Sequence, residues 1–225
     1  YEMETNFTCH LVLDVSASMR YGAKAEQKML YGAKMLTTLG YSIVKQSDRV
    51  SLTTFDENIV GYVPSGNSMA QVQRMTEHLD EIEPKEKTDM ADCLAEVSGR
   101  TGRREIVMVF SDFFTDLDSL EQVLQRLKYQ QHEVVLFQVL HHDELDFRFD
   151  GMIKFIGLEV PEDEVLMQPT ELRKAYLDAL GKFNTRFEEI CQANRVERVL
   201  VDTSRNMGDL LVDYLNQRGQ LKRAI

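Results

Sequence analysis

The chain has 225 residues, 43% of them hydrophobic, which is enough for one large α/β domain with a sizeable core. Its 26 basic and 37 acidic residues leave a formal net charge of −11. This acidity disfavours nucleic-acid binding, because phosphate backbones repel an acidic surface. No apolar run approaches the roughly 20 residues needed to span a bilayer, and no signal peptide is visible.

The three cysteines, Cys9, Cys93 and Cys191, are widely spaced. We interpret them as reduced core thiols of a cytoplasmic protein. The chain starts at Tyr1 rather than Met. We therefore interpret it as the C-terminal part of a longer protein, so that any membrane anchor further upstream lies outside this sequence.

Strand-like and helix-like patterns alternate along the first 140 residues. In chain order they predict a strand over 9–14, a helix over 24–45, a strand over 50–55, a hairpin-linked strand over 59–63, helices over 68–82 and 89–99, a strand over 105–111, a helix capped by Thr115, and a strand over 133–140. This order predicts a doubly wound α/β fold with a mostly parallel sheet and one antiparallel strand near an edge. The first and fourth strands should be neighbours at the switch point, and the apolar strand 133–140 should be central.

The segment after residue 140 has a different composition. The tract 143–150 is acidic and aromatic, and we interpret it as a solvated loop. The patterns that follow predict a short strand over 153–158, a turn over 160–164, a long helix over 170–193, a strand over 199–202 and a last helix over 207–217.

The most informative motif follows the first predicted strand. The apolar run from Cys9 ends in Asp14, and Ser16 and Ser18 follow at every second residue. Thr88 opens a later helical segment, and Asp112 ends the second strongly apolar strand. These oxygen donors suit Mg²⁺ or Mn²⁺, with Ca²⁺ less favoured. The alternative for the serines and for Thr88 is helix capping.

The motif Asp-x-Ser-x-Ser resembles the first loop of the metal-ion-dependent adhesion site in von Willebrand factor A domains. In that family a threonine follows on a second loop and an aspartate on a third. The five positions match in order; they are Asp14, Ser16, Ser18, Thr88 and Asp112. The chain departs from the pattern before Thr88, where Lys-Glu-Lys stands in place of the glycines common in these domains.

Nearly the whole chain also resembles a narrower group, the domain-of-unknown-function fifty-eight family. The segments that carry this resemblance are 1–6, 11–19, 145–151, 171–176 and 202–204, together with Tyr214 and Leu215. These bacterial von Willebrand A-like proteins are usually encoded beside MoxR-type AAA+ ATPases. The resemblance implies a single von Willebrand A-like domain over 1–225, with a family-specific insertion over 141–169.

Two carboxylates and three hydroxyls do not fill the coordination shell of a six-coordinate dication. Mg²⁺ therefore keeps water in its open positions. An Asp or Glu side chain of a partner could replace one of these waters. The resemblance implies the same role, namely protein–protein interaction rather than catalysis, with a MoxR-type ATPase or its client as the partner. Phe113 and Phe114 follow Asp112 directly and are candidates for an apolar rim that grips this partner, although core packing is the alternative for both.

Two other functions remain open. An Asp at the end of a first strand with Mg²⁺ also occurs in haloacid-dehalogenase phosphatases, which need a second acid two residues later. Ser16 stands at that position and cannot protonate a leaving group at neutral pH. The other possibility is a structural domain with a vestigial metal site. The five histidines, namely His10, His78, His132, His141 and His142, show no metal-ligand spacing with the cysteines and are interpreted as core or solvated residues.

Overall fold

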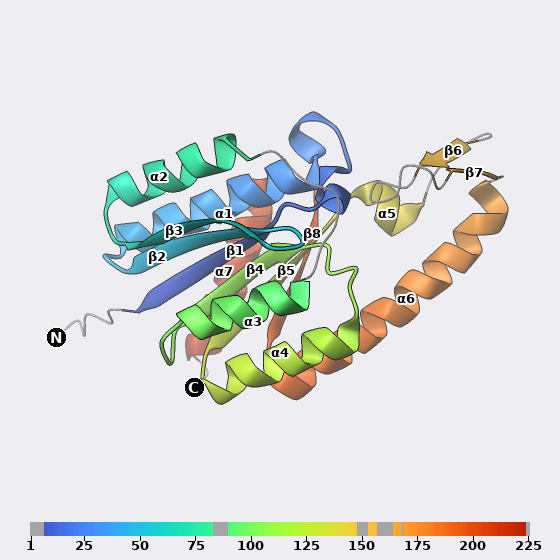
Figure 1. Cartoon of the computed structure of the whole chain (residues 1–225). Helices are drawn as coiled ribbons and strands as arrows, with labels where there is room; N and C mark the ends of the chain where they lie inside the picture. The colour runs from blue at the N-terminus through green and yellow to red at the C-terminus, as the bar shows by residue number, and fades with distance from the viewer. Residues whose placement is uncertain (1–6, 83–89, 148–152, 157–163, 168, 224–225) are drawn as a thin grey trace.

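A single mixed sheet organises the molecule, with helices on both of its faces (Figure 1). The structure, a computed structural model, describes residues 7–82, 90–147, 153–156, 164–167 and 169–223. Within these residues the main sheet has six strands in the order β3-β2-β1-β4-β5-β8. Their bounds are β1 Thr8–Asp14, β2 Arg49–Phe55, β3 Ile59–Gly66, β4 Ile106–Ser111, β5 Glu133–Leu140 and β8 Glu197–Asp202.

The pairing of the strands confirms the predicted fold class. Strand β1 pairs in parallel with β2 and β4, and β5 pairs in parallel with β4 and β8. Strand β3 is antiparallel to β2 and lies at the edge of the sheet. The sheet is therefore doubly wound, as expected of a von Willebrand A-like domain. The strand predicted to be central, β5, lies inside the sheet between β4 and β8, whereas β1 and β4 are the two middle strands.

Two apolar cores lie on the two faces of the sheet. One contains residues of α1, α2 and α7, and the other contains residues of α3, α4 and α6. The helix bounds are α1 Lys28–Lys45, α2 Met69–Asp80, α3 Met90–Arg100, α4 Leu117–Tyr129, α6 Pro169–Asn194 and α7 Met207–Arg223. Strands β1, β4 and β5 are apolar nearly throughout because both of their faces are covered.

Two predicted helix starts need correction. The helix expected from residue 24 begins at Lys28, after a short 3₁₀ turn, η2 (Lys24–Glu26). Lys24 has a positive φ of 53°, which is incompatible with continuous α-helix. The cap of α4 is Asp116 rather than Thr115, because the Asp116 carboxylate accepts the backbone N–H of Ser119 at 2.8 Å.

The region predicted as a solvated loop is partly helical. Residues His142–Asp146 form α5, which lies at the carboxyl end of β5. A separate two-stranded antiparallel sheet follows, formed by β6 (Ile153–Ile156) and β7 (Glu164–Met167). Figure 1 shows this small sheet at the end of α6 that projects away from the main sheet. The rest of the predicted turn and of the 143–150 tract lies outside the described residues.

All three cysteines are buried thiols, in agreement with the prediction. In the described part of the chain, no helix combines the length and the apolar character needed to cross a membrane.

Candidate metal centre

The carboxylate of Asp14 is held at the carboxyl end of β1. Its Oδ1 accepts the backbone N–H of Ser16 at 2.9 Å, and its Oδ2 accepts the hydroxyl of Ser111 at 2.6 Å. Asp14 is almost completely buried. Because β4 is the neighbouring strand, Ser111 and Asp112 reach the same edge as Asp14, as the predicted switch point requires.

Ser16 and Ser18 turn their hydroxyls toward each other. The two Oγ atoms are 3.2 Å apart at the start of a 3₁₀ turn, η1 (Ala17–Arg20). Ser16 occupies the N-cap position of this turn, but its side chain makes no capping hydrogen bond. Capping therefore does not account for the Ser16 hydroxyl, and this observation weakens the simpler interpretation of the motif.

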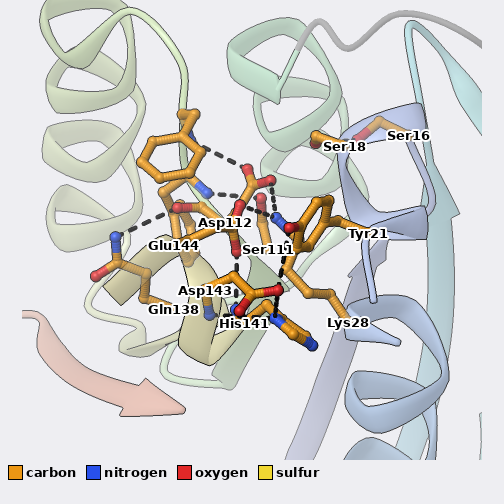
Figure 2. A network of polar contacts seen from close by, with 12 residues as sticks. Ser16, Ser18, Tyr21, Lys28, Ser111, Asp112, Gln138, His141, Asp143 and Glu144 are labelled. Carbon is orange, nitrogen blue, oxygen red and sulfur yellow. Dashed lines mark hydrogen bonds and ion pairs between the residues drawn. The ribbon is translucent and has the colours of Figure 1, made fainter. Parts of the chain in front are cut away.

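Asp112 lies in a buried ionic network that the sequence motif does not reveal. The ammonium of Lys28 donates to Asp112 Oδ2 at 2.9 Å and to Glu144 Oε1 at 2.8 Å. The other oxygen of Asp112 accepts the backbone N–H of Phe114. Figure 2 shows Lys28, Asp112 and Glu144 in the middle of the network, with Ser16 and Ser18 above them in this view.

Burial and charge set the protonation of this network. Burial, followed by repulsion from Asp112, raises the pKa of Asp14 to about 7. Burial lowers the pKa of Lys28, but the Asp112 and Glu144 carboxylates outweigh this effect, so its pKa is raised overall. Burial raises the pKa of Glu144, although the Lys28 ammonium opposes the shift.

The donor set fits a hard dication. We call Asp14, Ser16, Ser18 and Asp112 the oxygen site, since every candidate ligand atom is a carboxylate or hydroxyl oxygen. Burial first, and repulsion from Asp112 second, disfavour the negative charge of Asp14, and both effects raise its pKa. A bound dication would relieve that repulsion. The assignment of these residues to a metal ion nevertheless stays a prediction.

The remaining predicted site residues have different outcomes. Thr88 lies outside the described residues. Phe113 is not a rim residue, because its side chain is 0% exposed and its ring packs 5.1 Å from that of Phe187 in the core. Phe114 is 44% exposed, and its ring centroid lies 5.8 Å from Lys28 Nζ. Of these two aromatic residues, Phe114 is the one available to a partner.

Lys28 and Glu144 are the residues that sequence reasoning missed. Lys28 shares one helical face with Tyr31, Gly32 and Met35, all of which are buried. A lysine at a core-facing position of an amphipathic helix needs a buried anionic partner, and this spacing was the available signal. Glu144 offers no comparable signal, because the acidic composition of the 143–150 tract predicts a solvated loop.

Comparisons with known proteins agree with this architecture. A family model described as "Protein of unknown function DUF58" matches residues 1–185. No curated protein matches the chain. The crystal structure of the conserved hypothetical protein BatB from Bacteroides thetaiotaomicron is similar with a TM-score of 0.58 and 14% identity, and the match covers 96% of this chain and 99% of that chain.

Two further solved structures are similar. An aerotolerance-related membrane protein from Bacteroides fragilis NCTC 9343 has a TM-score of 0.57 and 16% identity, with 94% of this chain and 97% of that chain covered. The VWA domain of SpRpn10 has a TM-score of 0.48 and 12% identity, with 92% and 94% covered. At 14% and 16% identity, the first two similarities show a shared fold and nothing about function. No conclusion is based on the third structure, because its TM-score is below 0.5.

Proposed function

This chain belongs to the DUF58 family, whose function is unknown, and from that premise we propose that it is a protein-interaction module whose bound metal ion captures an acidic side chain of a partner. The observation that supports the proposal is that Asp14 and the Ser16–Ser18 hydroxyl pair lie at the carboxyl end of β1, next to the end of β4 that Asp112 follows. Mg²⁺ or Mn²⁺ is the ion that this oxygen set favours.

The charges explain why partner binding should depend on the metal. Lys28 and Glu144 carry opposite formal charges, which leaves the two carboxylates Asp14 and Asp112 to repel an approaching acidic side chain. A dication cancels these two charges and retains open coordination positions occupied by water. A partner Asp or Glu could then replace a water, and Phe114 could pack against the apolar part of its side chain.

The family resemblance supplies the candidate partner. Proteins of this family are usually encoded beside MoxR-type AAA+ ATPases, so we propose that the partner is such an ATPase or a client that it remodels, in the cytoplasm. The role would be assembly or remodelling of proteins, with the metal ion as the shared bond.

The test uses the purified chain and the MoxR-type ATPase from the same genome. Binding measured by biolayer interferometry should occur with Mg²⁺, disappear with EDTA and return when Mg²⁺ or Mn²⁺ is added back. Ser16→Ala and Ser18→Ala should each weaken it. Ser204→Ala is the matched control, because Ser204 is an exposed serine after β8 whose hydroxyl contacts only Asp202 among its described hydrogen bonds.

The partner's contacting residue gives a second arm of the same test. Once that Glu or Asp is located, its change to Gln or Asn keeps the shape and removes the charge. If the complex forms equally well with this change and in EDTA, the metal is not the bridge and the proposal fails.

A phosphatase of the haloacid-dehalogenase type needs a general acid two residues after its first aspartate. Ser16 stands two residues after Asp14, where a haloacid-dehalogenase phosphatase would need its general acid. We therefore expect no turnover of a generic aryl phosphate with Mg²⁺. Robust turnover that disappears in Asp14→Asn would replace the interaction proposal with a hydrolase.

A further inference from the structure

A second group of ligand-type side chains lies beside α5. Glu26 ends the short turn η2, His141 follows β5, and His142 begins α5. One carboxylate oxygen and one ring nitrogen from each histidine lie within 4.8 Å of one another. We call these three residues the histidine site.

The spacing of these atoms suits a common central ion better than direct hydrogen bonds. Glu26 Oε2 lies 3.6 Å from His141 Nε2 and 3.7 Å from His142 Nδ1, and both distances exceed a normal hydrogen bond. With metal–ligand bonds of about 2.0–2.1 Å, two ligands of a tetrahedral zinc ion lie roughly 3.3–3.4 Å apart. Small side-chain movements would therefore place all three atoms around one ion.

One ring nitrogen of the site is buried without compensation. Among the described residues, none hydrogen-bonds Nδ1 of His142, and solvent does not reach this atom. A buried polar atom without a partner costs free energy, which is why such atoms are rare in folded proteins. An ion bound between Glu26 and His142 would satisfy it.

Asp143 orients both histidines from the other side. Its Oδ2 lies 3.2 Å from His141 Nδ1, and its Oδ1 lies 3.3 Å from His142 Nε2. Tyr21 also donates its hydroxyl to Asp143 Oδ2 at 3.2 Å. A carboxylate that accepts the second ring N–H of a histidine is the usual partner of a metal-binding imidazole. Here one carboxylate serves two rings, and Figure 2 shows Asp143 next to His141.

The tautomer of His141 matters for this arrangement. In one tautomer Nδ1 accepts the backbone N–H of Asp143 at 3.2 Å, and Nε2–H points toward Glu26. In the other, Nδ1–H donates to the Asp143 carboxylate, and the lone pair of Nε2 faces Glu26. A bound metal ion selects the second tautomer.

The loop that carries Glu26 is packed directly against His141. Gly22 has a φ of +95°, and a Cβ at this position would lie 2.9 Å from His141 Cδ2 and 2.7 Å from the carbonyl oxygen of Glu26. The Tyr21 ring meets the His141 ring edge-on at 5.1 Å. The backbone therefore holds Glu26 near His141, while the Glu26 side chain is 49% exposed and leaves a path for an ion.

We propose that Glu26, His141 and His142 form a second metal site, which takes a borderline transition-metal dication such as Zn²⁺ through two imidazole nitrogens and a carboxylate. Imidazole ligands distinguish this site from the oxygen site, because nitrogen donors favour Zn²⁺ over Mg²⁺. Three protein ligands leave a fourth tetrahedral position for water or for a further ligand.

The test is a titration of the full chain with Zn²⁺ by calorimetry, and with Co²⁺ followed by visible absorption, both in excess Mg²⁺ to occupy hard-ligand sites. We expect one equivalent to bind, and Glu26→Gln and His142→Asn each to lower the affinity by more than about 10-fold, since outer-shell changes alone cost about 10–100-fold. Both side chains are nearly half exposed, so these variants should fold; circular dichroism checks this. Asp143→Asn should cost about 10–100-fold.

Two controls make the result decisive. Glu105→Gln changes another histidine–carboxylate contact, His10 Nε2 to Glu105 Oε2 at 2.8 Å, which lies near the start of β1 and β4. Asp14→Asn changes the oxygen site. Both controls should bind Zn²⁺ as the wild type does. The proposal is overturned if the wild type binds no Zn²⁺ at micromolar concentration, or if Glu26→Gln and His142→Asn bind it unchanged.

Discussion

The oxygen site and the histidine site lie at the same end of the sheet but are assembled in different ways. Asp14, Ser16 and Ser18 fall within five residues, and Asp112 ends the neighbouring strand. In the histidine site, Glu26 precedes α1, whereas His141 and His142 follow β5. Local spacing therefore reveals the first site, whereas only the packing of α5 against the start of α1 reveals the second.

A short chain of hydrogen bonds joins the two sites. The backbone N–H of His141 donates to Glu144 Oε2 at 2.8 Å, and Lys28 links Glu144 to Asp112. Lys28 therefore supplies the positive charge between the Asp112 and Glu144 carboxylates. The comparison predicts that substitutions within this series of hydrogen bonds affect stability most. Substitution of the exposed Phe114 should affect it least.

The largest effect should come from Lys28→Ala. The change leaves Asp112 and Glu144 buried without their shared cation, so it should lower the free energy of unfolding by about 3–5 kcal/mol. Urea denaturation in EDTA measures the loss. Lys34→Ala, an exposed position on the same helix, is the control and should stay within about 0.5 kcal/mol of the wild type. Equal stability of both variants would show that Lys28 does not hold the two sites together.

The second-largest effect should be a dependence of the free energy of unfolding on pH, caused by Asp14 of the oxygen site. The pKa of Asp14 is raised in the folded protein to about 7 from 3.8. The folded state therefore binds a proton more readily than the unfolded state, and its extra stability is present below pH 4 and lost as the pH rises through about 7. Between these values the slope from this group is on the order of 1 kcal/mol for each pH unit.

The Asp14→Asn variant isolates this contribution. Stability curves of the metal-free wild type and variant should diverge from pH 4 to pH 7, with the variant gaining relative to the wild type as the pH rises. Parallel curves would mean that Asp14 titrates normally and that repulsion from Asp112 is unimportant.

Asp112→Asn should behave in the opposite way to Asp14→Asn. It removes one of the two carboxylates that Lys28 contacts, and hydrogen bonds to charged groups are worth about 1.5–3 kcal/mol. We therefore expect a loss of that size in metal-free buffer at pH 8, where Asp14→Asn should be at least as stable as the wild type. Thermal and urea unfolding in EDTA distinguish the two. Two equally stable variants would contradict the asymmetry that Lys28 creates.

The smallest effect should come from Phe114→Ala at the rim. Phe114 is 44% exposed, so its removal should change stability little but weaken partner binding by about 1 kcal/mol or more if it packs against the partner. Tyr129→Ala, an exposed aromatic residue at the end of α4, is the control. Unchanged partner affinity in Phe114→Ala would place the interface elsewhere.

The sheet could be predicted from the sequence because its central strands are continuous apolar runs. The start of α1 could not be predicted, because the apolar spacing already begins near Ala25, within the 3₁₀ turn η2. The positive φ of Lys24, which separates this turn from a continuous helix, leaves no mark in the spacing. Phe113 was ambiguous for a similar reason. Its positive φ of 61° turns the chain after β4 and directs the ring into the core, and residue type alone does not reveal this.

For the sites, the sequence revealed ligand types only where they cluster along the chain. It identified Asp14 and Asp112 because each ends an apolar strand. Glu144 meets Lys28 only because α5 lies against the start of α1. His142 meets Glu26, in η2, only because the fold brings together residues more than 100 positions apart in the sequence. Such pairings depend on tertiary packing and leave no periodic signal.

The most direct test of the central claim is a calorimetric titration with Mg²⁺ of the wild type, Asp14→Asn and Glu26→Gln. Mg²⁺ prefers oxygen ligands, so the account predicts one equivalent bound by the wild type and by Glu26→Gln, and no binding by Asp14→Asn. Equal Mg²⁺ binding by the wild type and Asp14→Asn would contradict the assignment of the oxygen site.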